Sequence, residues 1–466
     1  MRFNTICFLT TFYLLSCTPH PSLLTNQGVS SLKRTLNQII IDSNQDFLIG
    51  VKIISLTNGK ILYELNSKKL LIPASNNKLY TCAAALDYLG KDYMFTTNIL
   101  RDKNNIILQG HGDPDLTVDQ LDSLAKITST FLKTVDTLFL DATSMDSLYF
   151  GKGWMWDEGA WWYAAPVGAL TVNDNCIDFY ISPDIPGKPA NINYFPYTEY
   201  ISLSNHSLTV TNNIELEKLK IDRDWVARTN HFKISGEIFY KKECDTLRRN
   251  IYDPTLFTGT IFRESLNNYG VKVKNLVKGT LKKDFDTLAY HNSNPIIFST
   301  ADLMNESDNL KAELFIKTIG ITNQSKGNWQ NGINRVKSFL SDSIGIDTSM
   351  IRLADGSGLS RYNLTSADHL TSLLIKMYSS KHRDDFISVL PGGGWENGTL
   401  ENRLEKEGAM IRAKTGGLSG VNNLSGYIFS PKYGPVAFSI LINGFVGDSE
   451  PYQHIQNEIV QNIIHD

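Results

Sequence analysis

Hydrophobic and polar positions alternate in two short stretches near the start of the chain, and this period of two predicts β-strands. The stretches cover residues 47–55 and 60–65, and the sequence Thr57-Asn58-Gly59 between them favours a hairpin turn. A continuous apolar run follows at residues 79–86 and predicts a helix that ends near Gly90. The first part of the chain is therefore expected to run strand, strand, helix.

The last third of the chain repeats these patterns. Apolar positions with helical spacing occur at residues 309–320 and 328–340, and a final helix is expected at about residues 453–464. Between them, residues 424–429 and 436–442 have the apolar, β-branched character of strands. Both ends of the chain thus combine strands with helices, which predicts that they build one domain together.

The middle of the chain has a different texture. Residues 95–290 are rich in short β-like runs, in Asn and Asp turns, and in aromatic side chains. We expect them to be an insertion, with a nested β-rich part near residues 180–245, in a domain formed by residues 28–94 and 291–466. A surface insertion is tolerated because the entropic cost of closing a loop grows only logarithmically with its length. The predicted class is α/β (α+β) with a large inserted β-rich region.

The first residues have the features of a processing signal. Arg2 provides a positive start, and the apolar stretch at residues 6–16 is too short to span a membrane. The sequence Leu14-Leu15-Ser16-Cys17 matches a bacterial lipoprotein cleavage box, in which Cys17 becomes the lipidated first residue. We expect a signal peptide at residues 1–16, a tether at residues 17–27, and attachment to a membrane through lipid on Cys17. The alternative is plain secretion, with Cys17 incidental.

Composition and charge exclude several classes of protein. The chain has 466 residues, of which 42% are hydrophobic and 20% are charged, as in an ordinary globular protein with more than one domain. The formal net charge is −3, and no basic surplus indicates a nucleic-acid partner. The nine histidines are dispersed without metal-ligand spacing, so no metal site and no cofactor are predicted.

The five cysteines form neither a dense disulfide framework nor a C-x-x-C metal motif. Cys7 belongs to the signal segment and Cys17 would carry lipid. Cys82 lies in the predicted helix and is expected to be a small core residue. At most one disulfide could form, and Cys176 with Cys244 is the less constrained pair.

Three short motifs occur in order along the chain. They are Ser75-Asn76-Asn77-Lys78, Ser307-Asp308-Asn309 and Lys414-Thr415-Gly416, a set typical of penicillin-binding proteins and β-lactamases. Other matches exist, at Ser30-x-x-Lys33 and Ser265-x-Asn267, but Ser30 lies in a polar segment, whereas Ser75 opens an apolar helix. The ordered set therefore predicts nucleophilic catalysis by Ser75.

The spacing of the first motif has a physical reason. A serine and a lysine three residues apart share one helix face, so Lys78 can reach the hydroxyl of Ser75. At the start of a helix, the backbone N–H of Ser75 is free of intrahelical bonding and can stabilise a developing oxyanion. Lys78 can act as a base only when it is neutral, so its pKa must be lowered. Burial and the charge of a nearby Lys414 would both lower it.

Further segments extend the similarity beyond the three motifs. They are Gly110-His111-Gly112-Asp113-Pro114-Asp115-Leu116, Gly153-Trp154-Met155-Trp156-Asp157-Glu158, Tyr163-Ala164-Ala165-Pro166 and Asp355-Gly356-Ser357-Gly358-Leu359-Ser360-Arg361. With them, nearly the whole chain after about residue 28 resembles the class C low-molecular-mass penicillin-binding proteins. These are D-alanyl-D-alanine carboxypeptidases/endopeptidases with a large insertion after the first motif. Their peptidase domain has a five-stranded antiparallel sheet flanked by helices.

The resemblance implies an enzyme that acts on peptidoglycan peptides through an acyl-serine and is inhibited by β-lactam antibiotics, in the periplasm. Ser75 would be the nucleophile and Lys78 its base. Ser307 would relay a proton to the leaving amine, and Asn309 would bind the substrate amide. Asp355, in a Gly-rich turn, is expected to make turn and cap hydrogen bonds rather than to take part in catalysis.

The resemblance also assigns the residues that would bind the substrate. Lys414 and Thr415 would hold its terminal carboxylate, and the backbone N–H groups of Gly417 and Ser75 would form the oxyanion hole. One departure concerns Gly417, because the family often has Ser or Thr after Lys-Thr-Gly. The pocket for the far end of the substrate's diamino-acid side chain would be lined by Glu158 (or its neighbour Asp157), Tyr163, Arg361 and Ser419.

Three other functions remain open for such a chain. A β-lactamase shares the acylation step but must release the drug quickly, and its chain is typically much shorter. An esterase on the same scaffold would use the same residues. A non-catalytic wall-binding lipoprotein would be indicated by loss of the serine or of either lysine, all of which are present.

Overall fold

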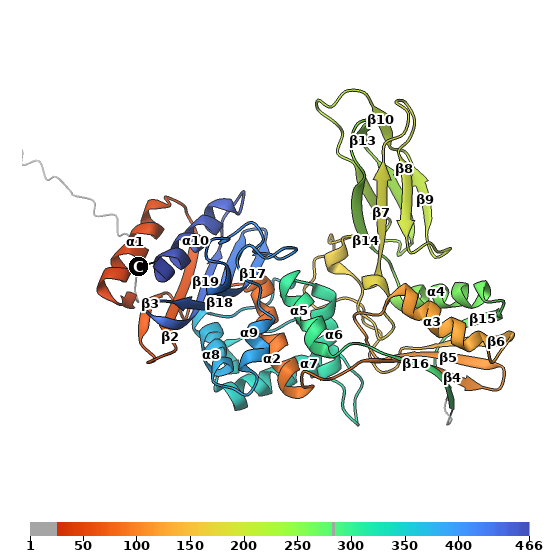
Figure 1. The fold of residues 1–466 in the computed structure, drawn as a ribbon, viewed down its shortest axis with the longest axis horizontal. Helices are drawn as coiled ribbons and strands as arrows, with labels where there is room; N and C mark the ends of the chain where they lie inside the picture. Colours follow the sequence, from red (N-terminus) through yellow and green to blue (C-terminus); the bar gives the residue numbers. More distant parts are fainter. Residues whose placement is uncertain (1–25, 282–284, 466) are drawn as a thin grey trace, which may run out of the picture.

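The computed structural model describes residues 26–281 and 285–465 (Figure 1). The predicted signal peptide, Cys17 and most of the predicted tether lie outside these residues. Among the described helices, none is long and apolar enough to cross a membrane.

The first part of the molecule is built on a six-stranded antiparallel sheet with the order β1-β3-β2-β19-β18-β17. In that order, the strands cover Asn26–Gly28, Ile61–Leu65, Leu48–Ser55, Gly434–Asn443, Val421–Ser430 and Ile411–Leu418. β2 pairs with β19 from Leu48↔Asn443 to Ser55↔Val436, so the two ends of the chain share one sheet. Five strands were expected, and the sixth is the short β1, which pairs with β3.

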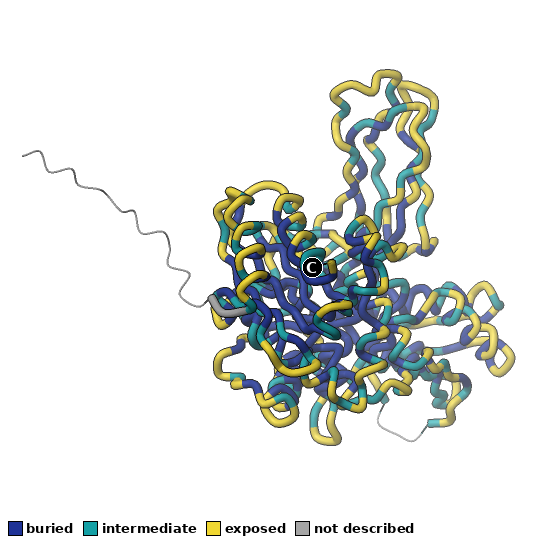
Figure 2. Tube along the Cα trace, turned by 60° about the vertical axis from the view of Figure 1, so that its left-hand side comes forward, coloured by how far each residue is buried: buried dark blue, intermediate teal, exposed yellow. Residues whose placement is uncertain are grey.

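The two faces of this sheet are buried under different helices. In β19, Val436, Phe438 and Ile440 belong to the core beneath α1 (Ser30–Asp42) and α10 (Glu450–His465). The alternate residues Ala437 and Leu441 belong to the core on the other face, beneath α8 (Ala367–Tyr378). Burial of both faces explains why β19 is apolar almost throughout, and β18 is buried along nearly its whole length (Figure 2).

A helical layer lies beside the sheet, and α2 (Lys78–Tyr88) runs through its centre. It is surrounded by α5 (Ile296–Asn305), α6 (Asn309–Ile319), α7 (Trp329–Ser338) and α9 (Arg383–Ser388). Every residue of α2 from Lys78 to Leu86 is buried, as is typical of a helix that is apolar all round. The helix therefore carries Lys78 into the protein interior.

The insertion begins with a mixed sheet of order β15-β6-β5-β4-β16. In that order, the strands cover Lys272–Lys278, Thr134–Asp141, Asn105–Gly110, Thr96–Asp102 and Asp286–Asn292. Helices α3 (Val118–Ser129) and α4 (Pro254–Asn268) pack together beside this sheet and share its core. Because β5, β6 and β15 are parallel, these helices occupy the crossover connections between them.

Between β6 and α4, the chain forms a narrow group of strands that projects from the rest of the molecule (Figure 1). β7 (Cys176–Ser182) pairs with β8 (Asn191–Phe195) and with β14 (Asp245–Asn250). Two smaller sheets contain β9 (Ser202–Asn205), β10 (Leu208–Val210), β11 (Lys220–Arg223), β12 (His231–Ser235) and β13 (Glu237–Phe239). The predicted class, α/β (α+β) with a large inserted β-rich region, is confirmed.

The disulfide considered for Cys176 and Cys244 does not form in this structure. Cys176 lies opposite Asn250 at one end of the β7–β14 ladder. Cys244 directly precedes Asp245, which pairs with Ile181 at the other end. Cys176 is buried and Cys244 is exposed, and both are free, as is the buried Cys82.

Candidate active site

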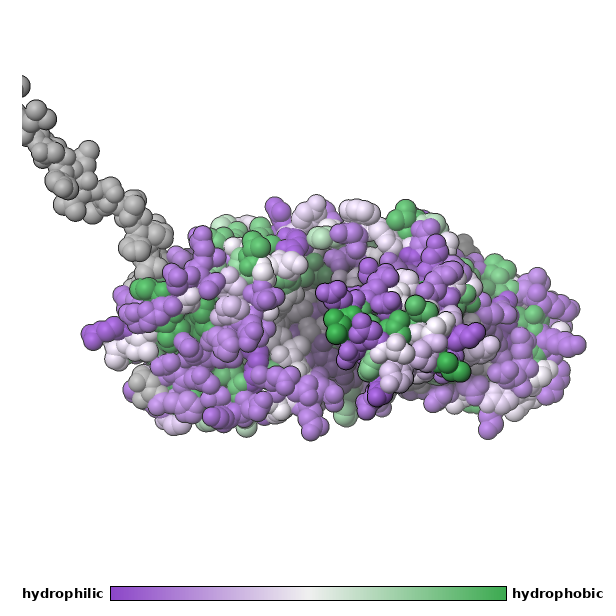
Figure 3. Space-filling view, turned by 90° about the horizontal axis from the view of Figure 1, so that it is seen from above, coloured by the Kyte–Doolittle hydropathy of each residue, from purple (hydrophilic) through white to green (hydrophobic). Residues whose placement is uncertain are grey.

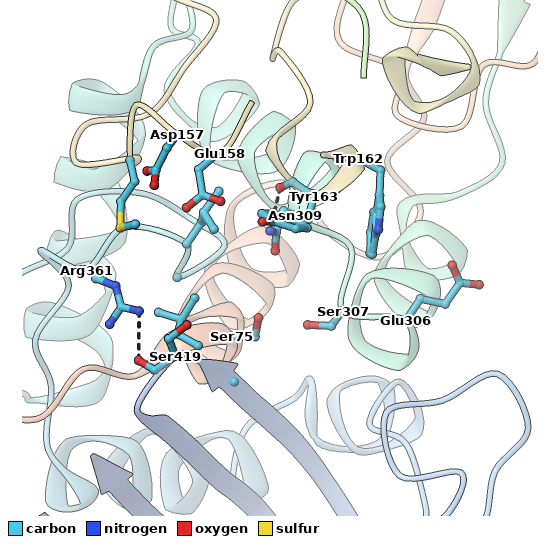
Figure 4. Close-up of a pocket in the computed structure, with 15 residues that line it drawn as sticks. Ser75, Asp157, Glu158, Trp162, Tyr163, Glu306, Ser307, Asn309, Arg361 and Ser419 are labelled. Carbon is cyan, nitrogen blue, oxygen red and sulfur yellow. Dashed lines mark hydrogen bonds between the residues drawn. The ribbon is translucent and has the colours of Figure 1, made fainter. Parts of the chain in front are cut away.

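A cavity of about 520 Å³ lies where the sheet, the helical layer and the insertion meet (Figure 4). Most of the residues predicted for the site line it, namely Ser75, Ser307, Asn309, Gly417, Ser419, Glu158, Tyr163 and Arg361. Thr415 lines an adjoining hollow together with Ser75 and Ser307. Lys78 and Lys414 are fully buried. Segments from five parts of the chain thus bring the predicted residues together.

Ser75 lies in a tight turn ahead of α2. A 3-10 helix covers Ala74–Asn77, and the α-helix begins only at Lys78. Ala74 has a φ of +46°, in the left-handed region that residues with a Cβ seldom adopt. The sequence led us to expect Ser75 at the start of an α-helix. The structure instead presents it from a strained turn, a feature that is frequent at functional sites.

Two glycines allow neighbouring segments to approach this turn. A Cβ on Gly358 would lie 1.8 Å from the carbonyl oxygen of Ala74, and a Cβ on Gly416 would lie 2.7 Å from that of Pro73. Gly358 belongs to the loop after residue 355, and Gly416 belongs to β17. Only glycine permits such close contact between backbones, so these two segments hold the serine turn from both sides.

The side chain of Lys78 ends in three hydrogen-bonding contacts. Its Nζ lies 2.9 Å from Ser75 Oγ, 2.6 Å from Asn309 Oδ1 and 3.0 Å from the carbonyl oxygen of Ser357. The two carbonyl-type oxygens can only accept, so they take two N–H groups of the amine. In a neutral amine, the lone pair is then directed at Ser75 Oγ. This is the geometry that a base needs to remove the serine proton.

Both buried lysines have lowered pKa values. Burial lowers the pKa of Lys78 to about 8, although the charges of Asp308, Glu313 and Asp355 raise it. Burial, together with the charge of Lys78, lowers the pKa of Lys414 well below its ordinary value. The sequence predicts that repulsion between the two lysines lowers the pKa of Lys78, whereas in the structure this repulsion adds to burial at Lys414.

The second motif connects α6 to the insertion. Ser307 has a φ of +65°, and the side chain of Asp308 caps α6 by accepting from the N–H of Lys311. Asn309 accepts from Lys78 and donates through Nδ2 to the carbonyl oxygen of Tyr163, at 2.8 Å. Both ends of its amide are therefore engaged by the protein. The contact with the substrate amide that the resemblance implies for Asn309 stays a prediction.

Two buried acids, of which Glu313 was not singled out from the sequence, fix the loop that binds Lys78. Glu313 accepts from the N–H groups of Gly356 and Ser357, at 2.9 and 2.7 Å. It also accepts from Trp329 Nε1 at 2.7 Å. Burial and the charge of Asp355 raise the pKa of Glu313 to about 7. The available signal was an acidic residue four positions after Asn309, on the same face of the helix.

Asp355 holds the other half of the same loop. It accepts from the N–H groups of Gly358 and Ser360, at 2.9 and 2.6 Å, and from Trp154 Nε1 at 3.0 Å. This agrees with the turn hydrogen bonding expected for it. Because Trp154 belongs to the insertion, Asp355 also ties the insertion to the loop beside the catalytic turn.

The mouth of the cavity carries opposite charges. Glu158 lies on the insertion side, and Arg361 lies across the opening, where its Nη2 donates to the carbonyl oxygen of Ser419 at 3.0 Å (Figure 4). Tyr163 stands between Glu158 and Asn309, and burial and a hydrogen bond with Glu158 raise its pKa. Gly417 borders open space, because a Cβ there would meet no atom within 4 Å.

Within the described residues, no group of three or more His, Cys, Asp and Glu side chains could hold a metal ion. The site presents a serine with an adjacent buried amine, beside a second buried lysine. Seen from above, the surface near the middle of the molecule is hollowed and bordered by mixed polar and apolar residues (Figure 3).

Comparison with known proteins agrees with this geometry. D-alanyl-D-alanine carboxypeptidase from Actinomadura sp. (strain R39) is 32% identical over 93% of this chain and 85% of its own length. D-alanyl-D-alanine carboxypeptidase DacB from Haemophilus influenzae is 27% identical over 94% and 93%. The crystal structure of penicillin binding protein 4 from Haemophilus influenzae superposes with a TM-score of 0.80 at 25% identity, over 92% of this chain and 99% of that one. The D-Ala-D-Ala carboxypeptidase 3 (S13) family model matches residues 32–463, so the chain belongs to this family of serine-type carboxypeptidases.

Proposed function

We propose that this enzyme removes the terminal D-alanine from peptidoglycan peptides through an acyl intermediate on Ser75. The observation that carries the assignment is the contact between Lys78 Nζ and Ser75 Oγ at 2.9 Å, with the other N–H groups of the amine held by Asn309 and Ser357. A serine hydroxyl needs a base to become a nucleophile, and a lysine with a pKa of about 8 is neutral in a useful fraction near neutral pH.

In the first half-reaction, neutral Lys78 takes the proton of Ser75 as Oγ attacks the carbonyl carbon of the penultimate D-alanine. The backbone N–H groups of Ser75 and Gly417 stabilise the resulting oxyanion. The C–N bond then breaks, and Ser307 passes a proton originating from Lys78 to the leaving amine of the last D-alanine. In the second half-reaction, water attacks the ester and loses a proton to Lys78. Lys78 then gives this proton to Ser75 Oγ as the C–O bond breaks, and the peptide acid leaves and loses its own proton to solvent.

Lys414 and Thr415 are proposed to bind the terminal carboxylate of the substrate. A buried lysine without an anionic partner tends to lose its proton, in agreement with the lowered pKa of Lys414. An entering carboxylate would offset this effect and restore the ammonium group. Lys414 would then discriminate in favour of peptides with a free C-terminus and in favour of β-lactams, which carry a carboxylate near the reactive amide.

Glu158 and Arg361 are proposed to select the far end of the substrate's diamino-acid side chain. A free ammonium and carboxylate on the same centre would meet Glu158 on one side of the opening and Arg361 on the other (Figure 4). Tyr163 would cover the methylene groups between this centre and the peptide, and Ser419 would border it. The opposite charges across one opening support this assignment.

Intact mass after mixing with a penicillin tests the assignment of the nucleophile. We expect one covalent equivalent on the wild type, no adduct on Ser75→Ala and a normal adduct on Ser30→Ala. An adduct that persists on Ser75→Ala would contradict the assignment.

Slow release of the drug supports a peptidase, whereas rapid turnover would indicate a β-lactamase. Hydrolysis of esters but not of D-alanyl-D-alanine peptides would indicate an esterase.

The chain is further proposed to be a periplasmic lipoprotein, anchored through lipid on Cys17. The basis is the sequence motif at residues 14–17 and the family's substrate, which lies outside the cytoplasmic membrane. Two acyl chains give stable anchoring, at ~0.8 kcal/mol per buried CH₂. Mass spectrometry of the mature N-terminus tests this proposal, and an unmodified N-terminus at another residue would support plain secretion.

The division into a peptidase domain (residues 28–94 and 291–466) and an inserted domain (residues 95–290, nested near 180–245) is likewise a proposal. The separate core of the inserted sheet and its helices supports it. Limited proteolysis tests it, and we expect early cuts near the ends of the insertion rather than inside the six-stranded sheet.

A further inference from the structure

A second cleft adjoins the active-site cavity on the side of the insertion. Its volume is about 360 Å³, and it shares Met155 and Glu158 with the cavity that contains Ser75. One wall is formed by residues 150–159 and the other by residues 223–228 of the projecting strands. We call it the tryptophan cleft, after Trp154, Trp156 and Trp225, which line it.

The cleft presents aromatic and apolar surface to solvent. The side chain of Trp156 is 77% exposed, and its ring centroid lies 5.4 Å from that of Trp225, with the two planes tilted by 43°. Phe150, Met155 and Val226 beside them are also exposed. A contiguous apolar surface of this kind on a soluble domain marks a binding site more often than chance exposure does.

The two walls of the cleft are held in a fixed relation to the active site. Arg223 is buried and donates to the backbone oxygen and the side-chain oxygen of Asn250, at 3.0 and 2.7 Å. Asn250 in turn donates to the carbonyl oxygens of Trp161 and Ala164, on either side of Tyr163. The loop that carries Trp225 is thereby fastened to the segment that lines the catalytic cavity, so the cleft is organised before a ligand arrives.

We propose that the tryptophan cleft binds the glycan strand to which the substrate peptide is attached. The proposal rests on the proposed function, which places a peptide of peptidoglycan in the adjoining cavity. Sugar rings present C–H faces that pack on aromatic rings, and they carry hydroxyl and acetamido groups that hydrogen-bond to charged side chains. Glu158 lies at one border of the cleft, and Arg228, whose Cζ is 5.7 Å from the ring centre of Tyr252, lies at another. The volume lies within the range of small-ligand sites, ~300–1,000 Å³.

The charges around the cleft favour a glycan over a lipid surface. Asp157, Asp222 and Asp224 are exposed on the two walls or directly beside them, and Glu158 lies within the cleft. Anionic membranes attract clusters of Lys and Arg and repel carboxylates. A neutral sugar is not repelled by the carboxylates, and its hydroxyl groups can donate hydrogen bonds to them.

A glycan held in the cleft would assist catalysis at Ser75. Binding energy from a part of the substrate that does not react can be used to position the part that does. A peptide and a glycan on the same molecule also raise each other's effective concentration at their neighbouring sites. Glycan-linked peptides should therefore be better substrates than the same peptides alone, and this advantage should depend on the indole rings of Trp156 and Trp225.

The test compares one D-alanyl-D-alanine peptide in two forms, free and attached to a muramyl-containing disaccharide, in the full-length enzyme. We expect Trp225→Ala and Trp156→Ala to lower kcat/KM on the glycan-linked form about three- to tenfold. Both variants should keep wild-type rates on the free peptide and on penicillin acylation. The matched control is Tyr197→Ala, because Tyr197 is 84% exposed on the projecting strands but does not line the cleft. It should behave as wild type on every substrate.

Calorimetric binding of a peptide-free glycan tetrasaccharide separates this inference from the proposed function. Weaker binding by Trp225→Ala than by Tyr197→Ala supports the glycan site even where cleavage is not measured. The inference is overturned if all variants bind the glycan equally well. It is also overturned if the tryptophan variants lose as much kcat/KM on the free peptide as on the glycan-linked peptide. If Trp225→Ala loses binding to phosphatidylglycerol vesicles but binds the glycan as well as the wild type does, the inference is overturned and the cleft is a membrane contact. A wild type that binds the glycan but cleaves neither peptide would contradict the proposed function alone.

Discussion

The interior of the site and its rim on the insertion are built in opposite ways. Lys78 is fully buried, and the Nζ atom contacts three oxygens from three different segments of the chain. On the rim, Trp156 is 77% exposed, and Glu158 is partly open to solvent. The interior fixes the reacting groups by close packing, whereas the rim offers side chains that a substrate must still order. We therefore expect substitutions in the interior to lower the reaction rate severely and substitutions on the rim to change it by smaller amounts.

The sharpest test of this contrast is removal of either buried lysine. Loss of a general base typically costs ~10²–10⁴-fold in rate, and we expect Lys78→Ala to lower penicillin acylation by this amount. Lys414→Ala should be similarly damaging, because it removes both the carboxylate partner and the second buried amine beside Lys78. Stopped-flow acylation measures both variants. Rates within threefold of wild type in either one would contradict the roles assigned here, and an unchanged circular dichroism spectrum controls for folding.

Glu313→Gln should produce the next largest effect, which is measured from the dependence of the acylation rate on pH. Acylation needs neutral Lys78, so the wild-type rate should rise with pH and level off above about 8. The negative charge of Glu313 raises the pKa of Lys78, so its removal should move this rise to lower pH. Gln accepts through one oxygen only, which leaves the N–H of Gly356 or Ser357 without a good partner, at a cost of ~1–3 kcal/mol in the free energy of unfolding.

The control for this variant is Glu306→Gln, which removes an exposed acid at the mouth of the same cavity. Solvent and salt screen an exposed charge, so the pH profile should stay in place. Urea unfolding and acylation between pH 6 and 9 (a range of about one to two units on each side of the pKa of Lys78) measure both variants. A profile that moves equally in both would show that Glu313 acts only through general electrostatics.

The sequence predicted which residues meet at the site better than it predicted the contacts that hold them in place, for a physical reason. Ser75 and Lys78 are three residues apart on one turn, so local geometry alone brings them together. The order of the strands and helices at both chain ends also followed from periodicity, with β18 and β19 close to their expected bounds. Contacts between distant segments left no local pattern. The strained φ of Ala74 and the role of Glu313 depend on such contacts, and so do the engagement of Asn309 with Tyr163 and the separation of Cys176 from Cys244.

The rim can be tested by Glu158→Gln, with Asp157→Asn as its matched control. Both acids line the cavity, but Glu158 is partly buried and lies near Tyr163, whereas Asp157 is exposed, so we expect Glu158 to pair with the ammonium group. We expect Glu158→Gln to reduce the preference for peptides with a free side-chain amine roughly tenfold, which is less than for a fully desolvated pair. The ratio of kcat/KM for peptides with and without the amine measures this. Penicillin acylation should stay near wild type, and a larger effect of Asp157→Asn would place the pocket one residue earlier.

The smallest effect is expected where the rim meets the interior, at Gly417 of β17, and the adjacent Gly416 provides the contrast. A Cβ on Gly416 would press on the Pro73 carbonyl oxygen at 2.7 Å and on Asn76 Oδ1 at 2.8 Å, so Gly416→Ala should displace the catalytic turn and impair acylation.

Gly417 has extended backbone and open space around its Cβ, so Gly417→Ser should fold without strain and change stability by no more than ~0.5 kcal/mol. The new hydroxyl could donate to the terminal carboxylate beside Thr415, where one hydrogen bond is worth ~0.5–1.5 kcal/mol. Such a bond would lower KM for D-alanyl-D-alanine peptides by up to about tenfold, with kcat little changed. Steady-state kinetics and thermal unfolding of both variants measure the contrast. Loss of acylation in Gly417→Ser comparable to that in Gly416→Ala would show that the carboxylate end of the site is as closely packed as the serine turn.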